Sequence, residues 1–306
     1  MDDLQSALDL VKFRDHYYGI GAYCDLDAGD GIWVNLELYE EAGVKSPVEY
    51  YKEGNWTWEE YYNCCKEMIQ DDDGDGIPEV YGTSLEIQNI FVYYAGKDYV
   101  SLNPDGTATN NIQSPEIARA VEFVARLRST EGLCYDGSDG RVAFAQGKLA
   151  TMEGAFWYTI DGSYIDMFKR GAIGWVPMPR DPDADKYYTQ VNYGKTMLVA
   201  GAPNPEGAAA YMNSLRYDIL DTDDNEPVDE EEFLEIQGIP YDMYMDIQAE
   251  RNRDGLTPVL MTWQMFDMGQ FFGDIYFRPF LGEPWSAIAQ EISPKIDDVI
   301  ETLLEQ

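Results

Sequence analysis

The sequence predicts an α/β fold in which helices outnumber strands. Short apolar runs bounded by glycine or proline are typical of buried strands, and they are scattered between longer segments whose apolar residues recur at helical spacing. No repeat of fixed period is visible in the sequence. With 306 residues, of which 45% are hydrophobic, the chain is long enough for one large or two ordinary domains with a packed core.

Two helix starts are marked by capping residues. Thr57 is followed three residues later by Glu60, which predicts a capping box. Ser114 before Pro115 predicts a second start, with serine as the N-cap and proline at the first helical position. The helices that we expect are 4–13, 36–42, 58–70, 115–130, 142–145, 204–215, 230–236, 241–252, 262–271 and 284–304.

The expected strands are few. Asn35 lies where one of them meets the helix that Gly43 closes; asparagine there is typical of an N-cap, although its amide also suits a binding cleft. The strands that we expect are 17–24, 31–35, 149–152, 172–179 and 188–200.

The stretch 141–157 leads to a tryptophan. A short helix ends at Gly147, an apolar strand follows, and Glu153-Gly154 is expected to break that strand before Trp157. Ligands of open α/β sheets bind beyond strand ends, so this indole is a candidate floor of a pocket. The alternative is that Trp157 belongs to the core, as most lone tryptophans do.

The composition excludes some partners. Lys and Arg number 21 against 57 Asp and Glu, a net charge of -36, which repels nucleic acid and anionic lipid surfaces. That field favours neutral or cationic ligands, or it serves only solubility. Aromatic residues make up 14%, with 23 Tyr and 7 Trp, and stacking on neutral sugars would use them.

Few residues suit metal or nucleophilic chemistry. The single histidine, His16, makes most zinc sites and any histidine-based triad improbable. The four cysteines show no C-x-x-C spacing, and we expect buried free thiols. No apolar run is long enough to span a bilayer, and the acidic N-terminus is unlike a signal peptide, so the sequence as written indicates a cytosolic or a trimmed chain.

An acidic turn at 71–79 is a candidate calcium site. Alternating carboxylates around glycines suit a hard cation, as in an EF-hand loop, but the twelfth position is Gly82 and not a bidentate glutamate. The alternative is a solvated acidic turn. The candidate ligands are Asp71, Asp73, Asp75, the Ile77 carbonyl and Glu79.

Five segments match one family in order along the chain. They are Val34–Gly43, Trp56–Glu60, the acidic turn ending at Tyr81-Gly82, Gly147–Trp157, and Val176–Pro179 with Asn204–Ala208. Together these segments resemble the extracellular solute-binding proteins of carbohydrate ABC transporters, the family that includes maltose-binding protein. The chain departs from the family at Val34, Thr151 and Phe156, where the family has tyrosine, methionine and a small residue.

The resemblance implies a periplasmic-binding-protein-like two-lobe fold that is helix-rich, with its first lobe truncated, as in a fragment or a natural short form. It implies that residues 1–35 hold a remnant of the first lobe and a crossing strand, 36–179 the second lobe, and 180–306 a return through the first lobe with the C-terminal helices. It also implies an extracellular or cell-surface lipoprotein, a monomer that delivers carbohydrate to a transmembrane permease and requires no cofactor.

The resemblance and the residue types together give a set of ligand-binding candidates. Aromatic rings stack on sugar faces, and amides or carboxylates bind the hydroxyl rim. Two other functions stay open: a glycoside hydrolase, which needs paired carboxylates, and a calcium-binding or adhesion module without transport. The candidates are Trp157, Asn35, Glu153, Trp175, Asn192, Tyr193 and Trp263.

Overall fold

The structure is a computed structural model of the 306-residue chain. The residues that it describes fall into six longer stretches and several short pieces. The stretches are 30–84, 91–103, 105–137, 139–155, 164–191 and 268–305, and the pieces are 12–13, 16–17, 19–21, 196–198, 203–208, 210–211, 214, 231, 234, 241–243, 245–246, 256–260 and 266.

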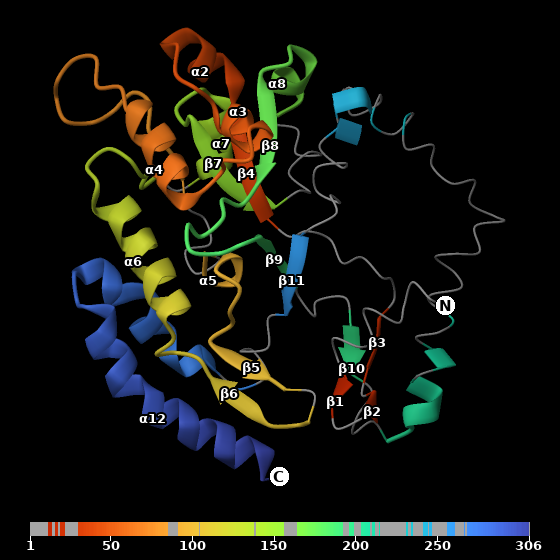
Figure 1. The fold of residues 1–306 in the computed structure, drawn as a ribbon. Helices are drawn as coiled ribbons and strands as arrows, with labels where there is room; N and C mark the ends of the chain where they lie inside the picture. The colour runs from red at the N-terminus through yellow and green to blue at the C-terminus, as the bar shows by residue number, and fades with distance from the viewer. Residues whose placement is uncertain are drawn as a thin grey trace.

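A three-stranded antiparallel sheet supports the candidate site, with the strand order β7–β4–β8 (Figure 1). Both edges of β4 are therefore hydrogen-bonded. Val34 lies opposite Thr151 of β7 and Gly174 of β8. The strands are β4 (Asp30–Asn35), β7 (Thr151–Ala155) and β8 (Ile173–Pro177).

The two faces of this sheet pack into different cores. Side chains alternate between the faces of a strand, so Ile32 and Val34 share one face while Trp33 points to the other. All three are fully buried. This explains why β4 reads as a continuous apolar run and not as an alternating one.

The larger core lies on the face of Ile32 and Val34. It joins α4 and α5 to α6 and to the C-terminal helix α12, which packs against α6. In α12 the isoleucines at 288, 292, 296 and 300 recur every four residues, which places them on one buried stripe. The helices are α4 (Trp58–Glu67), α5 (Phe91–Tyr94), α6 (Pro115–Ser129) and α12 (Trp285–Leu304).

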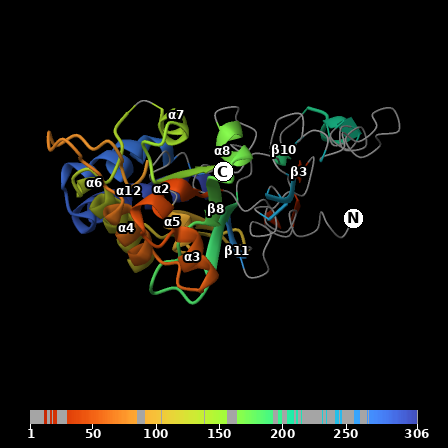
Figure 2. The same cartoon turned by 90° about the horizontal axis from the view of Figure 1, so that it is seen from above.

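The smaller core covers the opposite face with α7 (Gly140–Ala145) and α8 (Ile165–Lys169). Trp33 is its centre: its ring lies 6.0 Å from that of Tyr164 and 6.3 Å from that of Phe168. Figure 2 shows α8 on one side of β8 and α3 on the other. The sheet is thus a layer between two sets of helices.

The remaining elements surround this three-layer body. Parallel pairing joins β9 to β11, and antiparallel pairing joins β5 to β6, β3 to β10 and β1 to β2. They are β1 (Lys12–Phe13), β2 (His16–Tyr17), β3 (Gly19–Gly21), α2 (Leu36–Ala42), α3 (Pro47–Lys52), β5 (Val100–Leu102), β6 (Ala108–Asn110), β9 (Tyr187–Val191), β10 (Thr196–Leu198), β11 (Leu256–Leu260), η5 (Met268–Phe271), η6 (Gly273–Phe277) and η7 (Pro279–Leu281).

The capping residues at the helix ends confirm the predicted starts. The Thr57 hydroxyl accepts from the backbone N–H of Glu60, and Ser114 caps α6 in the same way. Gly43 closes α2 with a φ of 65°, in the left-handed region that favours glycine. The carboxylate of Glu60 accepts from the side chain of Asn55, and the reciprocal capping box lies instead at Ser46, before α3.

Three secondary-structure predictions are wrong, and several described elements, β11 among them, were not predicted. Glu153-Gly154 does not break the strand, because pairing with Ile32 and Gly31 of β4 carries β7 through both residues. Residues 12–13 pair with β2 and do not end a helix. The strand β11 was not predicted, because its partner β9 is distant in sequence. Residues 268–271 form a 3₁₀ turn, not the end of an α-helix.

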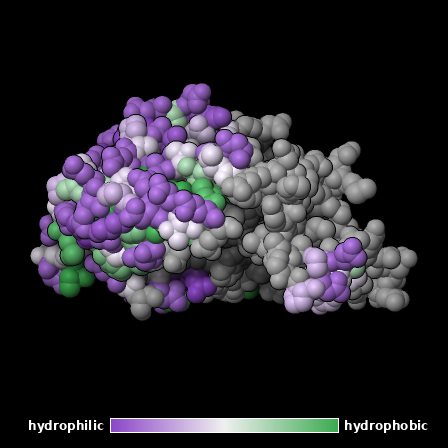
Figure 3. All heavy atoms as spheres, turned by 90° about the horizontal axis from the view of Figure 1, so that it is seen from below, coloured by the Kyte–Doolittle hydropathy of each residue, from purple (hydrophilic) through white to green (hydrophobic). Residues whose placement is uncertain are grey.

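The described surface is hydrophilic over most of the face shown in Figure 3, with scattered apolar spots. Among the described residues, no helix is both long and apolar enough to cross a bilayer. The predicted domain boundaries after residues 35 and 179 stay predictions.

The buried stripe of α12 gives a test of the larger core. Ile292→Ala is expected to lower the free energy of unfolding by about 2–5 kcal/mol, because Ile292 is fully buried and its loss leaves a cavity. Leu303→Ala in the same helix, at a side chain 38% exposed, is the matched control and is expected to cost much less. Urea denaturation of both variants measures the difference; equal losses would contradict this packing.

Candidate functional site

One end of the central sheet leads toward the predicted tryptophan. In β4 and β7, Asp30 lies opposite Ala155 and Gly31 opposite Gly154. Gly31 also lies opposite Pro177, so the carboxyl ends of β7 and β8 meet at the start of β4. Trp157 follows Ala155 by two residues in the sequence. This end of the sheet is therefore the part of the described structure that is closest in sequence to Trp157.

Glu153 is a fully buried carboxylic acid near this end. Its side chain shares the face of Ile32, the residue opposite it, and its backbone N–H donates to the Ser84 carbonyl at 3.2 Å. An acidic side chain with no exposed surface is rare outside functional sites and ion pairs. The structure thus makes Glu153 an unusual residue of the larger core.

Tyr94 on α5 faces the same region. Its hydroxyl donates to the backbone carbonyl of Asp30 at 2.9 Å. Burial, followed by the charges of Asp30 and Glu153, raises the pKa of Tyr94 well above its usual value. The tyrosine is therefore a neutral donor at physiological pH. The sequence analysis missed Tyr94 and Asp30, because a four-residue helix and a strand start carry no periodic signal.

Trp175 lies on the opposite face from Glu153. It is the residue opposite Trp33, and its indole packs over Gly31 so closely that a Cβ built on Gly31 would lie 2.4 Å from the ring. Only 4% of Trp175 is exposed. In this structure the ring is a packing element of the sheet end.

Asn35 lies at the other end of β4. Its side-chain oxygen accepts from the backbone N–H of Leu38 at 3.3 Å, so it is the N-cap of α2, the first of the two interpretations given above. Five residue-to-residue steps of extended chain lead from Asp30 to Asn35, about 16 Å at 3.3 Å per step. The structure therefore places Asn35 at the opposite end of β4 from Asp30, two residues beyond Trp33 and its partner Trp175.

Four of the predicted ligand-binding residues lie outside the described residues: Trp157, Asn192, Tyr193 and Trp263. Their roles stay predictions. The other three share one sheet: Glu153 and Trp175 lie on opposite faces in the middle of β7 and β8, and Asn35 ends β4.

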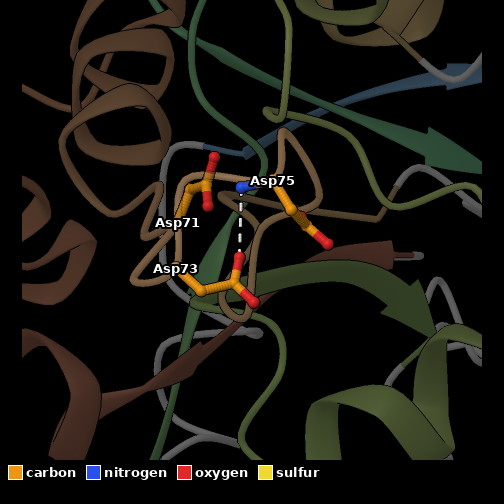
Figure 4. A group of neighbouring side chains, drawn as sticks. All are labelled: Asp71, Asp73 and Asp75. Atoms are coloured by element: carbon orange, nitrogen blue, oxygen red, sulfur yellow. Dashed lines mark hydrogen bonds between the residues drawn. The ribbon is translucent and has the colours of Figure 1, made fainter.

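The acidic turn brings three carboxylates together. Oxygens of Asp71, Asp73 and Asp75 lie within 4.8 Å of one another, and all three residues are exposed (Figure 4). Asp71 accepts from the N–H groups of Gly74 and Gly76, at 2.8 and 3.0 Å. These hydrogen bonds order the turn.

The other two candidate calcium ligands are part of the same turn. The Glu79 carboxylate accepts from the N–H of Asp72 at 2.8 Å, and the Ile77 N–H donates to Asp75 at 2.7 Å. Backbone donors thus already use several of the carboxylate oxygens. Calcium binding stays a prediction from the sequence.

Two larger surface cavities lie away from these residues. One, of about 620 Å³, lies between α2 and α3, and the other, of about 330 Å³, lies between α4, α6 and the loop after β8. In the second, the buried carboxylate of Asp181 accepts from Arg119 at 2.7 and 3.1 Å. This ion pair fastens the loop to α6, and neither cavity contains a predicted ligand-binding residue.

Residues 6–216 match the family described as bacterial extracellular solute-binding protein. That match covers more than half of the 306 residues, and the chain belongs to this family.

Solved structures of other proteins have a similar fold. An ABC substrate-binding protein from Listeria monocytogenes in complex with cycloalternan has a TM-score of 0.60 and 16% identity, covering 97% of this chain and 75% of that one. The maltose/maltodextrin-binding domain from Bdellovibrio bacteriovorus bound to maltotriose gives 0.60 and 16%, with 96% and 76% covered.

A third solved structure carries a different ligand. UgpB from Mycobacterium tuberculosis in complex with glycerophosphocholine gives a TM-score of 0.58 and 16% identity, covering 98% of this chain and 75% of that one. None of the curated proteins compared with the chain matches it. The comparisons confirm the two-lobe, helix-rich α/β fold; the truncated first lobe stays a prediction.

The contact between Gly31 and Trp175 gives a test of the sheet end. Gly31→Ala is expected to lower the free energy of unfolding by about 1–3 kcal/mol, because the new Cβ would overlap the indole. Gly269→Ala is the control, since a Cβ at Gly269 meets nothing within 4 Å. Thermal and urea denaturation measure both; a neutral Gly31→Ala would show that Trp175 is not held against this strand.

Proposed function

We propose that the protein is the extracellular cargo-binding component of an ABC importer and that its cargo is a neutral carbohydrate. The observation that carries the proposal is the family match over residues 6–216. Among the structures of similar fold, those from Listeria and Bdellovibrio hold cycloalternan and maltotriose. The partners are the carbohydrate and the transmembrane permease that receives it.

The composition supports an uncharged cargo. A net charge of -36 repels phosphorylated and other polyanionic solutes, and the 14% aromatic content offers flat apolar surfaces. An aromatic ring stacked on a sugar face contributes on the order of 1 kcal/mol beyond its burial. The same charge repels a second copy of the chain, which supports a monomer.

In this proposal the ring of Trp157 is the main stacking surface, Tyr193 and Trp263 offer further rings, and Asn192 and Glu153 bind hydroxyl groups. The Glu153 side chain has no exposed surface, so its contact with cargo requires the residues around it to move. A carboxylate accepts hydrogen bonds from sugar hydroxyls without reacting with them. Asn35 and Trp175 already cap α2 and pack over Gly31, so any contact with cargo adds to those structural roles.

The protein binds its cargo without catalysis and needs no cofactor. A glycoside hydrolase requires two carboxyl groups on either side of the bond that is cleaved. Besides Glu153, the described residues bury the carboxylates of Asp98 and Asp181. Asp98 accepts from the Tyr93 hydroxyl and the Tyr99 N–H, and Asp181 pairs with Arg119, so both already have structural partners. This geometry supports capture and release.

A ligand screen tests the proposed cargo. Thermal-shift assays with tagatose, maltotriose and β-1,6-galactobiose are expected to show stabilisation by at least one sugar, about 2.7 kcal/mol at a ligand concentration 100 times Kd. Calorimetry gives Kd, and chromatography after long incubation is expected to recover the sugar intact. Cleaved sugar would establish the hydrolase instead.

Two further ligands in the same assay, glycerophosphocholine and calcium, distinguish the proposed function from the alternatives. Stabilisation by glycerophosphocholine and by none of the sugars would reject the carbohydrate proposal. Melting that responds only to calcium and EDTA, and that loses this response in Asp73→Asn, would favour the calcium-binding module.

A substitution tests whether the ring of Trp157 stacks on the sugar. Trp157→Ala is expected to remove the sugar-induced rise in melting temperature while leaving a folded protein, because the stacking surface is lost. Tyr211→Ala, at a ring 62% exposed, is the aromatic control and is expected to bind as the wild type does. Calorimetric affinities of both variants decide; unchanged binding by Trp157→Ala would remove Trp157 from the site.

A further inference from the structure

The segment Tyr81–Ser84 runs along the outer edge of β7. The opposite edge of β7 is paired with β4, so the strand is held from both sides up to Glu153. Three consecutive contacts define this edge: the N–H groups of Ala150, Thr151 and Glu153 donate to the carbonyls of Tyr81, Gly82 and Ser84 at 3.0, 3.0 and 3.2 Å.

Gly82 places this segment directly on α4. A Cβ built on Gly82 would lie 2.3 Å from the backbone carbonyl oxygen of Cys65 and 2.8 Å from its Cβ. Only a residue without a side chain permits so close an approach. Segment 81–84 is thus fixed between the backbone of α4 and the edge of β7.

A buried hydroxyl group adds to this attachment. Thr151 Oγ1 donates to the Gly82 carbonyl at 2.8 Å, so that carbonyl accepts from both the amide and the hydroxyl of one residue. The Sγ of Cys65 lies 3.4 Å from Thr151 Oγ1. Because the hydroxyl proton is used on Gly82, the thiol is the donor, and burial keeps it protonated by raising the pKa of Cys65.

A second hydroxyl chain runs beside the first. The Tyr61 hydroxyl lies 2.7 Å from Thr83 Oγ1, which in turn donates to the Ser84 carbonyl at 3.4 Å. Tyr61 is therefore the donor, and burial raises its pKa well above the usual value. Cys65 and Tyr61 of α4 are thus linked, through the hydroxyls of Thr151 and Thr83, to the carbonyls of Gly82 and Ser84. Both carbonyls also accept hydrogen bonds from N–H groups of β7.

We propose that Thr151 is a positioning residue of the cargo site: its hydroxyl, with the Tyr61–Thr83 pair, fixes the start and middle of β7, the strand that leads through Glu153 to Trp157. Thr151, Cys65, Tyr61 and Thr83 are all fully buried, so water cannot replace a lost hydrogen bond. Loss of the hydroxyl loosens the attachment of β7 to segment 81–84 while the apolar core stays in place. The link to cargo rests on the proposed function.

The test compares two substitutions at one position. Thr151→Val keeps the shape and removes the hydroxyl, whereas Thr151→Ser keeps the hydroxyl. For Thr151→Val we expect about tenfold faster amide hydrogen exchange at Glu153 and about tenfold weaker binding of the best sugar among tagatose, maltotriose and β-1,6-galactobiose. Thr151→Ser is expected to restore both values to within about twofold of the wild type.

A stability-matched variant separates positioning from general destabilisation. Ile296→Val, in the fully buried stripe of α12, lowers the melting temperature without touching β7 and is expected to leave affinity unchanged. If Thr151→Val binds sugar as tightly as the wild type, or weakens binding no more than Ile296→Val does, the inference is overturned.

Hydrogen exchange separates the two ways of failing. If the wild type binds no sugar, the proposed function fails. The exchange rate of the Glu153 amide still tests whether the Thr151 hydroxyl fixes β7. Exchange at Glu153 that is no faster in Thr151→Val than in Ile296→Val overturns the inference whether or not a sugar binds.

Discussion

Burial of β4 on both faces and pairing along both edges is the constraint on which the described structure depends. Ile32 and Val34 need one helical layer and Trp33 needs another, so the sheet becomes the middle layer. The edges need β7 and β8, which the chain supplies only after 115 further residues, from Asn35 at the end of β4 to Ala150 before β7. A strand that is satisfied on all sides cannot shift register without unpairing and exposing apolar side chains.

This constraint makes the sheet rigid, and under the proposed function that rigidity supports a binding residue that follows β7. The attachment through Gly82, Thr151 and Tyr61 extends that rigidity from β4 to α4 with buried hydrogen bonds. Binding proteins gain affinity when contacting groups are held in place before the ligand arrives, because less conformational entropy is lost on binding. Under the proposed function, a net charge of -36 disfavours anionic solutes without any local contact.

Local signals predicted local features well. The caps at Thr57 and Ser114, the glycine stop at Gly43 and the C-terminal helix 284–304 each depend on residues within a turn or two, and the structure has all of them. Strands that depend on distant partners were less predictable: β11 needs β9, and β7 continues through Gly154 because of β4. The neighbours of Glu153 were equally hidden, since Tyr94 and Asp30 come from elements far away in sequence.

By itself the sequence determined the fold class, the family resemblance, the acidic surface and the residue types available for binding sugars, because composition, spacing and caps are properties of the chain alone. The tertiary structure decided which of the candidate binding residues lie close together. It put Asn35 at the far end of β4 as a helix cap and Glu153 and Trp175 on opposite faces of one sheet. The physical reason is that strand register, which long-range pairing sets, assigns each side chain to one face and one end.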